Sequence, residues 1–246
     1  MIAEFADPRL AAVYDTINAY GPGEQLDFYR ELAVEIGAAS IVDLGCGTGL
    51  ITRVLAGLGF RMTGLDAAPA MVEVARQRPF GDQVDWIVGP VDRLGTPNAD
   101  LAIMSGHVAQ FFVTDADWSA ALHGLRRALR SAGTLAFESR NPDARGWEQW
   151  TRNFAVTVED PVAGRIETWS EVSDVRDGIV TYTNHYRFAA TGDELVSSAR
   201  LRFRSQLELT ESLAAAGFTV ERVYGDWDRG PVTSTAPELI VVATGT

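Results

Sequence analysis

The chain has 246 residues, 46% of them hydrophobic, and a formal net charge of -12 at pH 7. This length and composition suffice for one sizeable core, so one domain with an embellishment is a simpler interpretation than two domains. The acidic excess disfavours nucleic acid as a partner, and no apolar run reaches the ~20 residues of a membrane span.

The N-terminal segment is predicted to form two helices between residues 8 and 39, around the turn Tyr20-Gly21-Pro22-Gly23. Its first eight residues lack the basic start and apolar core of a signal peptide. We therefore expect a cytoplasmic protein.

A glycine-rich turn follows, in the sequence VDLGCGTG at residues 42–49. A buried strand at residues 40–44 precedes it and a helix at about 50–58 follows, so the turn lies at the carboxyl end of a strand, where open α/β sheets bind ligands. We expect its three glycines to bring bare backbone against a ligand. A second strand ends at Asp66 and places a carboxylate at the same edge, where it can accept both hydroxyls of a ribose.

The glycine spacing distinguishes between two nucleoside cofactors. A dinucleotide fingerprint is G-x-G-x-x-G, whereas here Gly49 comes one place early. Asp43 would repel a pyrophosphate but suits a ligand that carries an ammonium and a sulfonium. Both observations favour S-adenosylmethionine, and an NAD-dependent oxidoreductase is the less favoured alternative.

The next elements alternate between helix and strand. A helix is predicted at residues 69–78, strands at 84–88, 101–105 and 134–138, and a further helix before a stop at Gly133. This alternation predicts an α/β fold with a doubly wound parallel sheet. Between residues 140 and 204 it stops, and strand-like runs at 167–173, 179–188 and 195–203 predict an antiparallel meander.

Four segments resemble the class I S-adenosylmethionine-dependent methyltransferases. VDLGCGTG resembles their first motif, GLDAAPAMVEVAR their second strand and helix, ADLAIMSGHVAQFF their fourth strand and acceptor-side loop, and AAGFTVERV with PELIVVA their closing antiparallel β-hairpin. The resemblance implies a Rossmann-like single domain with a helical cover (1–39), a cofactor-binding core (40–139), an inserted β lid (140–204) and a C-terminal helix and hairpin (205–246). The lid is similar to that of the N-methyltransferases of amino sugars and of glycine.

The implied activity is transfer of a methyl from S-adenosylmethionine to nitrogen or oxygen of a small-molecule acceptor, by a monomer or homodimer. A non-catalytic regulator that binds the cofactor is the alternative. Three scattered histidines without ligand spacing indicate no metal site. Cys46 is expected to act as a small residue of the turn rather than as a nucleophile.

Cofactor contacts are expected along the strand ends and the helical cover. The family usually has an acidic residue directly after the glycine that ends its third strand, but Pro90 stands there, so Val91 and Asp92 are the candidates for the adenine; Asp92 can alternatively cap a helix. Tyr14 is expected either to contact the cofactor or only to pack. The full candidate set is Tyr14, Asp43, Gly45, Cys46, Gly47, Asp66, Ala67, Val91, Asp92 and Ser105.

A catalytic base is needed if the acceptor atom is protonated. His107, just beyond the fourth strand, is the best candidate by location, with a purely structural histidine as the alternative. Glu138 and Arg140 at the end of the fifth strand are its rivals. The middle lid strand offers Tyr182 and Tyr186 on its bulkier face, which leaves His185 exposed on the other. Acceptor walls are expected at Trp147 and Trp150.

Overall fold

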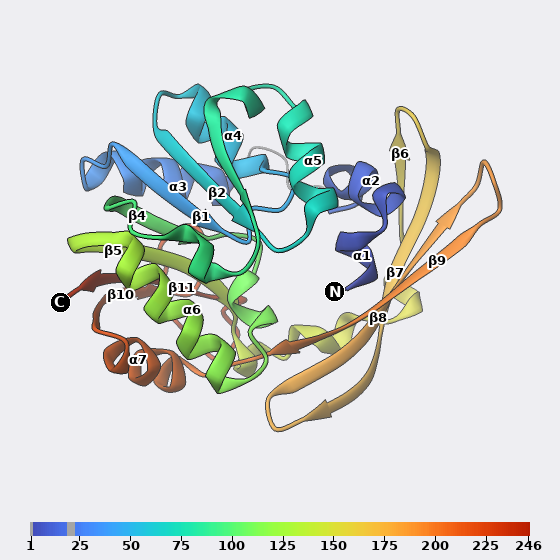
Figure 1. The fold of residues 1–246 in the computed structure, drawn as a ribbon. Coiled ribbons are helices and arrows are strands. Elements are labelled where there is room, and N and C mark those ends of the chain that lie inside the picture. Colours follow the sequence, from blue (N-terminus) through green and yellow to red (C-terminus); the bar gives the residue numbers. More distant parts are fainter. Residues whose placement is uncertain (1, 19–22) are drawn as a thin grey trace.

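The computed structural model describes residues 2–18 and 23–246, so residues 20–22 of the turn predicted at 20–23 lie outside the described residues. A seven-stranded sheet with the order β10-β11-β5-β4-β1-β2-β3 forms the centre of the molecule (Figure 1). All neighbours from β5 to β3 are parallel, whereas β11 is antiparallel to both β5 and β10. The strands are β1 (Ser40–Leu44), β2 (Arg61–Asp66), β3 (Val84–Val88), β4 (Ala99–Met104), β5 (Leu129–Arg140), β10 (Phe218–Tyr224) and β11 (Glu238–Gly245).

Helices cover both faces of this sheet, because its central strands are apolar on both sides. In β1, Ile41 faces α3 (Glu24–Glu35) and α4 (Leu50–Gly57), while Val42 faces α6 (Asp115–Ala128) and α7 (Gln206–Ala215). The helix α5 (Pro69–Gln77) packs against β2 and β3. Single 3-10 turns lie at η1 (Gly81–Gln83), η2 (Val91–Leu94), η3 (Val108–Phe111), η4 (Pro142–Ala144), η5 (Gly146–Gln149) and η6 (Arg152–Phe154). The predicted α/β fold is confirmed.

The predicted helix stop at Gly133 is wrong. The helix α6 ends at Ala128, because Leu129 already has extended dihedral angles and pairs with Ala99 of β4. Gly133 therefore lies inside β5, which is longer than the strand expected from the sequence.

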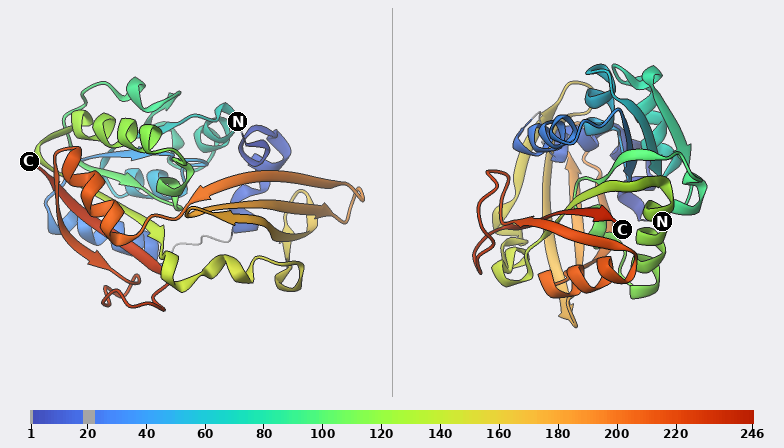
Figure 2. Two further views of the ribbon diagram at one scale, coloured as in Figure 1. Left: turned by 90° about the horizontal axis from the view of Figure 1, so that it is seen from below. Right: turned by 90° about the vertical axis from the view of Figure 1, so that its left-hand side faces the viewer.

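A separate antiparallel sheet projects from the carboxyl side of the central sheet (Figures 1 and 2). It contains the three predicted strands and one more, which the sequence analysis missed because its short run is largely exposed and ends in acidic residues. The four strands, β6 (Val156–Asp160), β7 (Gly164–Arg176), β8 (Ile179–Phe188) and β9 (Glu194–Arg202), are called the lid below.

The first two helices, α1 (Ala3–Ala6) and α2 (Pro8–Asn18), connect the lid to the core. Leu10 and Val13 pack with Tyr186 of the lid, and Ala11 packs with Met71 of α5. The expected orientation of β8 is confirmed, since Tyr182 and Tyr186 are both buried. His185 is half-buried rather than exposed, because its ring stacks on that of Trp169 with the centroids 4.6 Å apart.

Candidate functional site

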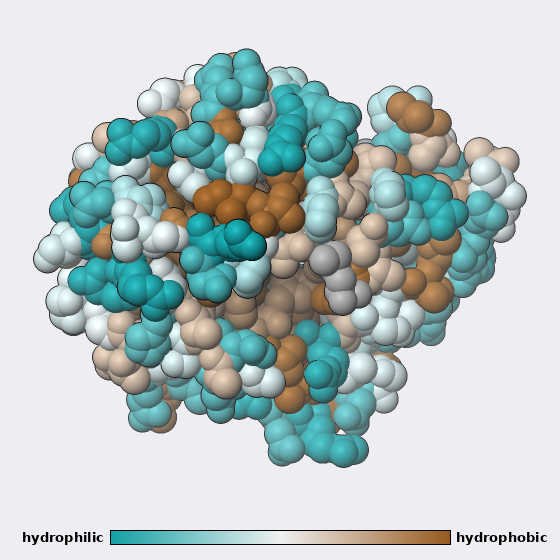
Figure 3. All heavy atoms as spheres, in the orientation of Figure 1, coloured by the Kyte–Doolittle hydropathy of each residue, from teal (hydrophilic) through white to brown (hydrophobic). Residues whose placement is uncertain are grey.

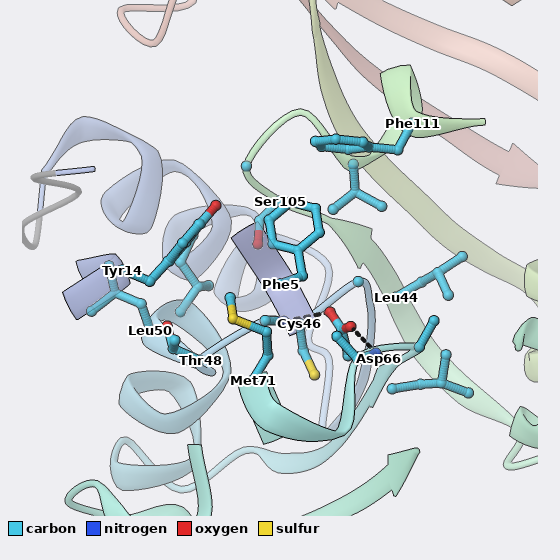
Figure 4. A pocket seen from close by; sticks show the side chains of 18 of the residues that line it. Phe5, Tyr14, Leu44, Cys46, Thr48, Leu50, Asp66, Met71, Ser105 and Phe111 are labelled. Carbon is cyan, nitrogen blue, oxygen red and sulfur yellow. Dashed lines mark hydrogen bonds between the residues drawn. The ribbon is translucent and has the colours of Figure 1, made fainter. Parts of the chain in front are cut away.

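A cavity of about 360 Å³ lies at the carboxyl ends of β1, β2 and β4, where the glycine-rich turn meets the N-terminal helices (Figure 4). In Figure 3 the visible face is hollowed between the core and the lid, and hydrophobic residues gather in the hollow. Eight of the ten predicted cofactor contacts line this cavity: they are Tyr14, Gly45, Cys46, Gly47, Asp66, Ala67, Val91 and Ser105. We call it the cofactor cavity.

The three glycines of the turn have different roles. A Cβ atom on Gly49 would lie 2.4 Å from the ring of Trp86, and one on Gly45 would lie 2.6 Å from Val108, so packing of the chain alone requires glycine at both positions. Gly47 has a φ of 54°, and a Cβ there would meet only Met71, at 3.5 Å. The expectation that all three glycines face a ligand is thus wrong for Gly49, which does not line the cavity.

Asp66 links the end of β2 to the glycine-rich turn. One carboxylate oxygen accepts a hydrogen bond from the Gly47 amide at 2.8 Å and the other accepts one from the Ala68 amide at 2.8 Å. Burial raises the pKa of Asp66, and these amides act against the rise because they favour the ionised form. The side chain thereby presents a fixed acceptor to the cofactor cavity.

Two acidic residues of the expected set do not line the cofactor cavity. Asp43 is buried under the turn, where it accepts a hydrogen bond from the Thr52 hydroxyl at 2.6 Å; its other oxygen has no partner among the described residues, and burial raises its pKa to about 7. Asp92 is exposed in η2, whose N-cap is Pro90. Asp92 therefore lies outside the cavity and makes no capping hydrogen bond at the start of η2, and its contact with an adenine stays a prediction.

His107 and Glu138 belong to a buried network behind the cavity walls. His107 Nε2 lies 2.9 Å from a carboxylate oxygen of Glu238, and burial lowers the pKa of His107 to about 3. Glu138 accepts hydrogen bonds from the Gln25 side chain at 2.6 Å, from the Tyr29 hydroxyl and from the His107 amide at 2.9 Å. Neither side chain lines the cofactor cavity or the cavity of about 160 Å³ beside it, so a catalytic role for either residue stays a prediction.

A second, polar cavity of about 160 Å³ adjoins the first and shares Phe5, Tyr14, Gly106 and Phe111 with it. We call it the polar cavity. Tyr182 lines it, as do four residues from the N-terminus, β5, the following segment and the lid: Glu4, Arg140, Trp150 and Asn184.

Other candidates lie farther out. Tyr186 and Trp150 line a neighbouring cavity of about 220 Å³, and burial together with Glu4 raises the pKa of the Tyr186 hydroxyl, which keeps it protonated. Trp147 packs on Phe203 instead of lining either cavity. The sequence analysis missed Glu4 because nothing near residue 4 signals its contacts in the lid.

Comparisons with known proteins agree with this geometry. Residues 41–133 match a family model described as a methyltransferase domain. The chain is 29% identical to 2-phytyl-1,4-naphtoquinone methyltransferase of Thermosynechococcus vestitus over 87% of this chain and 88% of that protein. It is 36% identical to malonyl-(acyl-carrier protein) O-methyltransferase of Serratia marcescens over 100 residues, which are 40% of this chain and only 37% of that protein.

The solved structure of CalS10, an amino pentose methyltransferase from Micromonospora echinaspora with bound S-adenosylmethionine, superposes with a TM-score of 0.71 at 23% identity, over 95% of this chain and 97% of that one. This likeness extends through the lid. Residues 41–133 thus resemble a methyltransferase domain, and the whole chain shares the fold of this S-adenosylmethionine-bound methyltransferase. The residues matched by the family model, 41–133, include the glycine-rich turn and Asp66.

The cavity fits the cofactor of the methyltransferase domain. Gly47 leaves open the space that any larger side chain would fill, and Asp66 holds an acceptor at the strand edge where a ribose would lie. Within residues 2–18 and 23–246, no group of three or more potential metal ligands is present, and no helix has the length and apolar content of a membrane span.

Proposed function

We propose that the chain transfers a methyl group from S-adenosylmethionine to a nitrogen or oxygen atom of a small molecule. The observation that carries the proposal is the contact between the two cavities, since Tyr14 and Gly106 separate the cofactor cavity from a polar cavity suited to an acceptor. The names of similar proteins include O-methyltransferases and a sugar N-methyltransferase, which supports both acceptor atoms.

The residues of the cofactor cavity bind and orient S-adenosylmethionine. Asp66 accepts from the ribose hydroxyls, the backbone at Gly47 allows close approach, and Val91 packs against the adenine. When bound, S-adenosylmethionine supplies a methyl group that its sulfonium has already activated. Positioning the acceptor in line with that methyl can therefore provide most of the rate acceleration. The monomer or homodimer state and the cytoplasmic location stay predictions of the sequence.

The test combines binding and turnover. Calorimetric titration with S-adenosylmethionine, S-adenosylhomocysteine and NAD should give micromolar affinity for the first two only. Release of S-adenosylhomocysteine should then be screened with a library of small amines, alcohols and acids. Tight binding without turnover on any acceptor would favour the non-catalytic regulator, and binding of NAD alone would refute the proposal.

A further inference from the structure

The polar cavity contains one arginine, Arg140, which forms no direct ion pair among the described residues, although it lies opposite Glu238 of β11 and lowers the pKa of that carboxyl. Arg140 Nη1 donates a hydrogen bond to the Gln110 side chain at 2.9 Å, and the guanidinium lies over the Trp150 ring at 5.3 Å from its centroid. The next two arginines along the chain differ, since Arg145 and Arg152 form ion pairs at 2.6 and 2.7 Å. Arg140 therefore has hydrogen-bond donors to offer to an anion in the cavity.

The same cavity contains a buried carboxylate without a cationic partner among the described residues. Glu4 is 7% exposed and accepts a hydrogen bond from the Asn184 side chain at 2.9 Å and another from the Tyr186 hydroxyl. Its backbone amide donates to the Ser197 hydroxyl at 2.9 Å, which fixes the residue against the lid. Burial raises the pKa of Glu4, as expected of a carboxylate that no cation stabilises.

The buried carboxylate of Glu4 is costly for the protein alone, since a charge removed from water needs a partner, and the partly buried Arg140 in the same cavity has no direct ion pair. A ligand with the complementary pair of charges supplies both partners at once. The chain has no lysine, so an arginine must serve wherever a permanently charged cation is needed. The planar guanidinium matches the two oxygens of a carboxylate or a phosphate.

We propose that the acceptor is a small amine that also carries an anionic group, with the anion bound by Arg140 and the amine next to Glu4. This inference rests on the proposed function, because the polar cavity serves an acceptor only if the adjoining cavity holds the cofactor. The ammonium gives one proton to Glu4, and the neutral nitrogen then forms the N–C bond while the methyl–sulfur bond breaks. The electron pair of that bond stays on sulfur, and the product is a methylated ammonium ion.

The test uses the intact protein saturated with S-adenosylhomocysteine and two matched pairs of probes. Calorimetry compares glycine with glycine methyl ester and O-phosphoethanolamine with ethanolamine, so that the two pairs distinguish a carboxylate from a phosphate. We expect the member with the anionic group to bind about 10- to 100-fold more tightly than the amine without it, in at least one pair. Arg140→Met should abolish this preference, whereas Arg140→Lys should keep part of it.

Arg145→Met is the matched control, because Arg145 is exposed and paired with Glu148, and it should leave the preference unchanged. Glu4→Gln should weaken the binding of both members of a pair by about tenfold, while the preference for the member with the anionic group stays. Equal affinity for the members with and without the anionic group in both pairs, including no binding of any probe, would overturn the inference. Binding of S-adenosylhomocysteine itself is measured first: its absence would refute the proposed function, whereas its presence without any anion preference refutes only this inference.

Discussion

Replacing Asp66 by alanine removes the carboxylate that links the end of β2 to the glycine-rich turn. Its oxygens accept hydrogen bonds of 2.8 Å from the amides of Gly47 and Ala68, so the change leaves two amides without an acceptor. Because water can reach this edge of the cavity, we expect a loss of only about 2 kcal/mol in the free energy of unfolding.

Asp66→Ala should also lower the affinity for the cofactor. A charged acceptor for two ribose hydroxyls contributes about 1.5 to 3 kcal/mol to the binding free energy, so Asp66→Ala should weaken cofactor binding by roughly 10- to 150-fold. S-adenosylmethionine and S-adenosylhomocysteine should lose the same factor, since the ribose is common to both. Asp66→Asn keeps the shape and one acceptor oxygen, and we expect a smaller loss.

Calorimetric titration of both ligands into each variant measures these losses, with urea unfolding to confirm that the variants are folded. Asp92→Ala is the matched control, because Asp92 is exposed outside the cavity, and its affinity should equal that of the parent. The reasoning fails if folded Asp66→Ala binds either ligand as the parent does, or if Asp92→Ala shows the larger loss.

Three further changes test other parts of the site. Gly47→Val should reduce cofactor affinity below detection, because the side chain enters the cavity at a φ of 54° where valine is strained; calorimetry on the folded variant checks this. In the parent, a folded-state pKa of Asp43 raised from 3.8 to about 7 lowers the free energy of unfolding as pH rises from 4 to 7. Asp43→Asn lacks this loss, so its free energy of unfolding should rise relative to that of the parent by up to about 4 kcal/mol over the same range. Urea unfolding at both pH values measures the difference, and a constant difference would contradict the prediction. His107→Gln should lower turnover by less than about tenfold. Any rise of the rate near pH 6 to 7 should remain, because a pKa of about 3 keeps His107 neutral in that range. If the pH profile of the variant lacks this rise, His107 is the catalytic base after all.

The sequence predicted the cofactor cavity because its signals are local. The turn, the strand before it and Asp66 lie within about thirty residues, and parallel strands must end at one edge of the sheet. Even so, glycine spacing did not reveal which glycine faces the ligand. That depends on Trp86 and Val108, which come from elsewhere in the chain and approach Gly49 and Gly45.

The polar side of the site could not be predicted in the same way, because its contacts join distant segments. Glu4 meets Asn184 across 180 positions, and His107 meets Glu238 across 131. No periodicity relates such residues before the chain has folded. The position of His107 directly after β4 made it a candidate base in the sequence. In the structure its ring contacts Glu238 of β11 and lines neither cavity.

The two cavities also differ in what holds them in place. Most of the cofactor cavity comes from the core, where strands of the central sheet are paired on both sides, whereas the polar cavity depends on α1 and β5 being held against the lid. Phe5 and Tyr14 belong to both walls, and α2 rests on Tyr186 through Leu10 and Val13. We therefore expect a change in the lid to be transmitted to the cofactor cavity through these two aromatic rings, and so to alter both acceptor binding and the affinity for the cofactor.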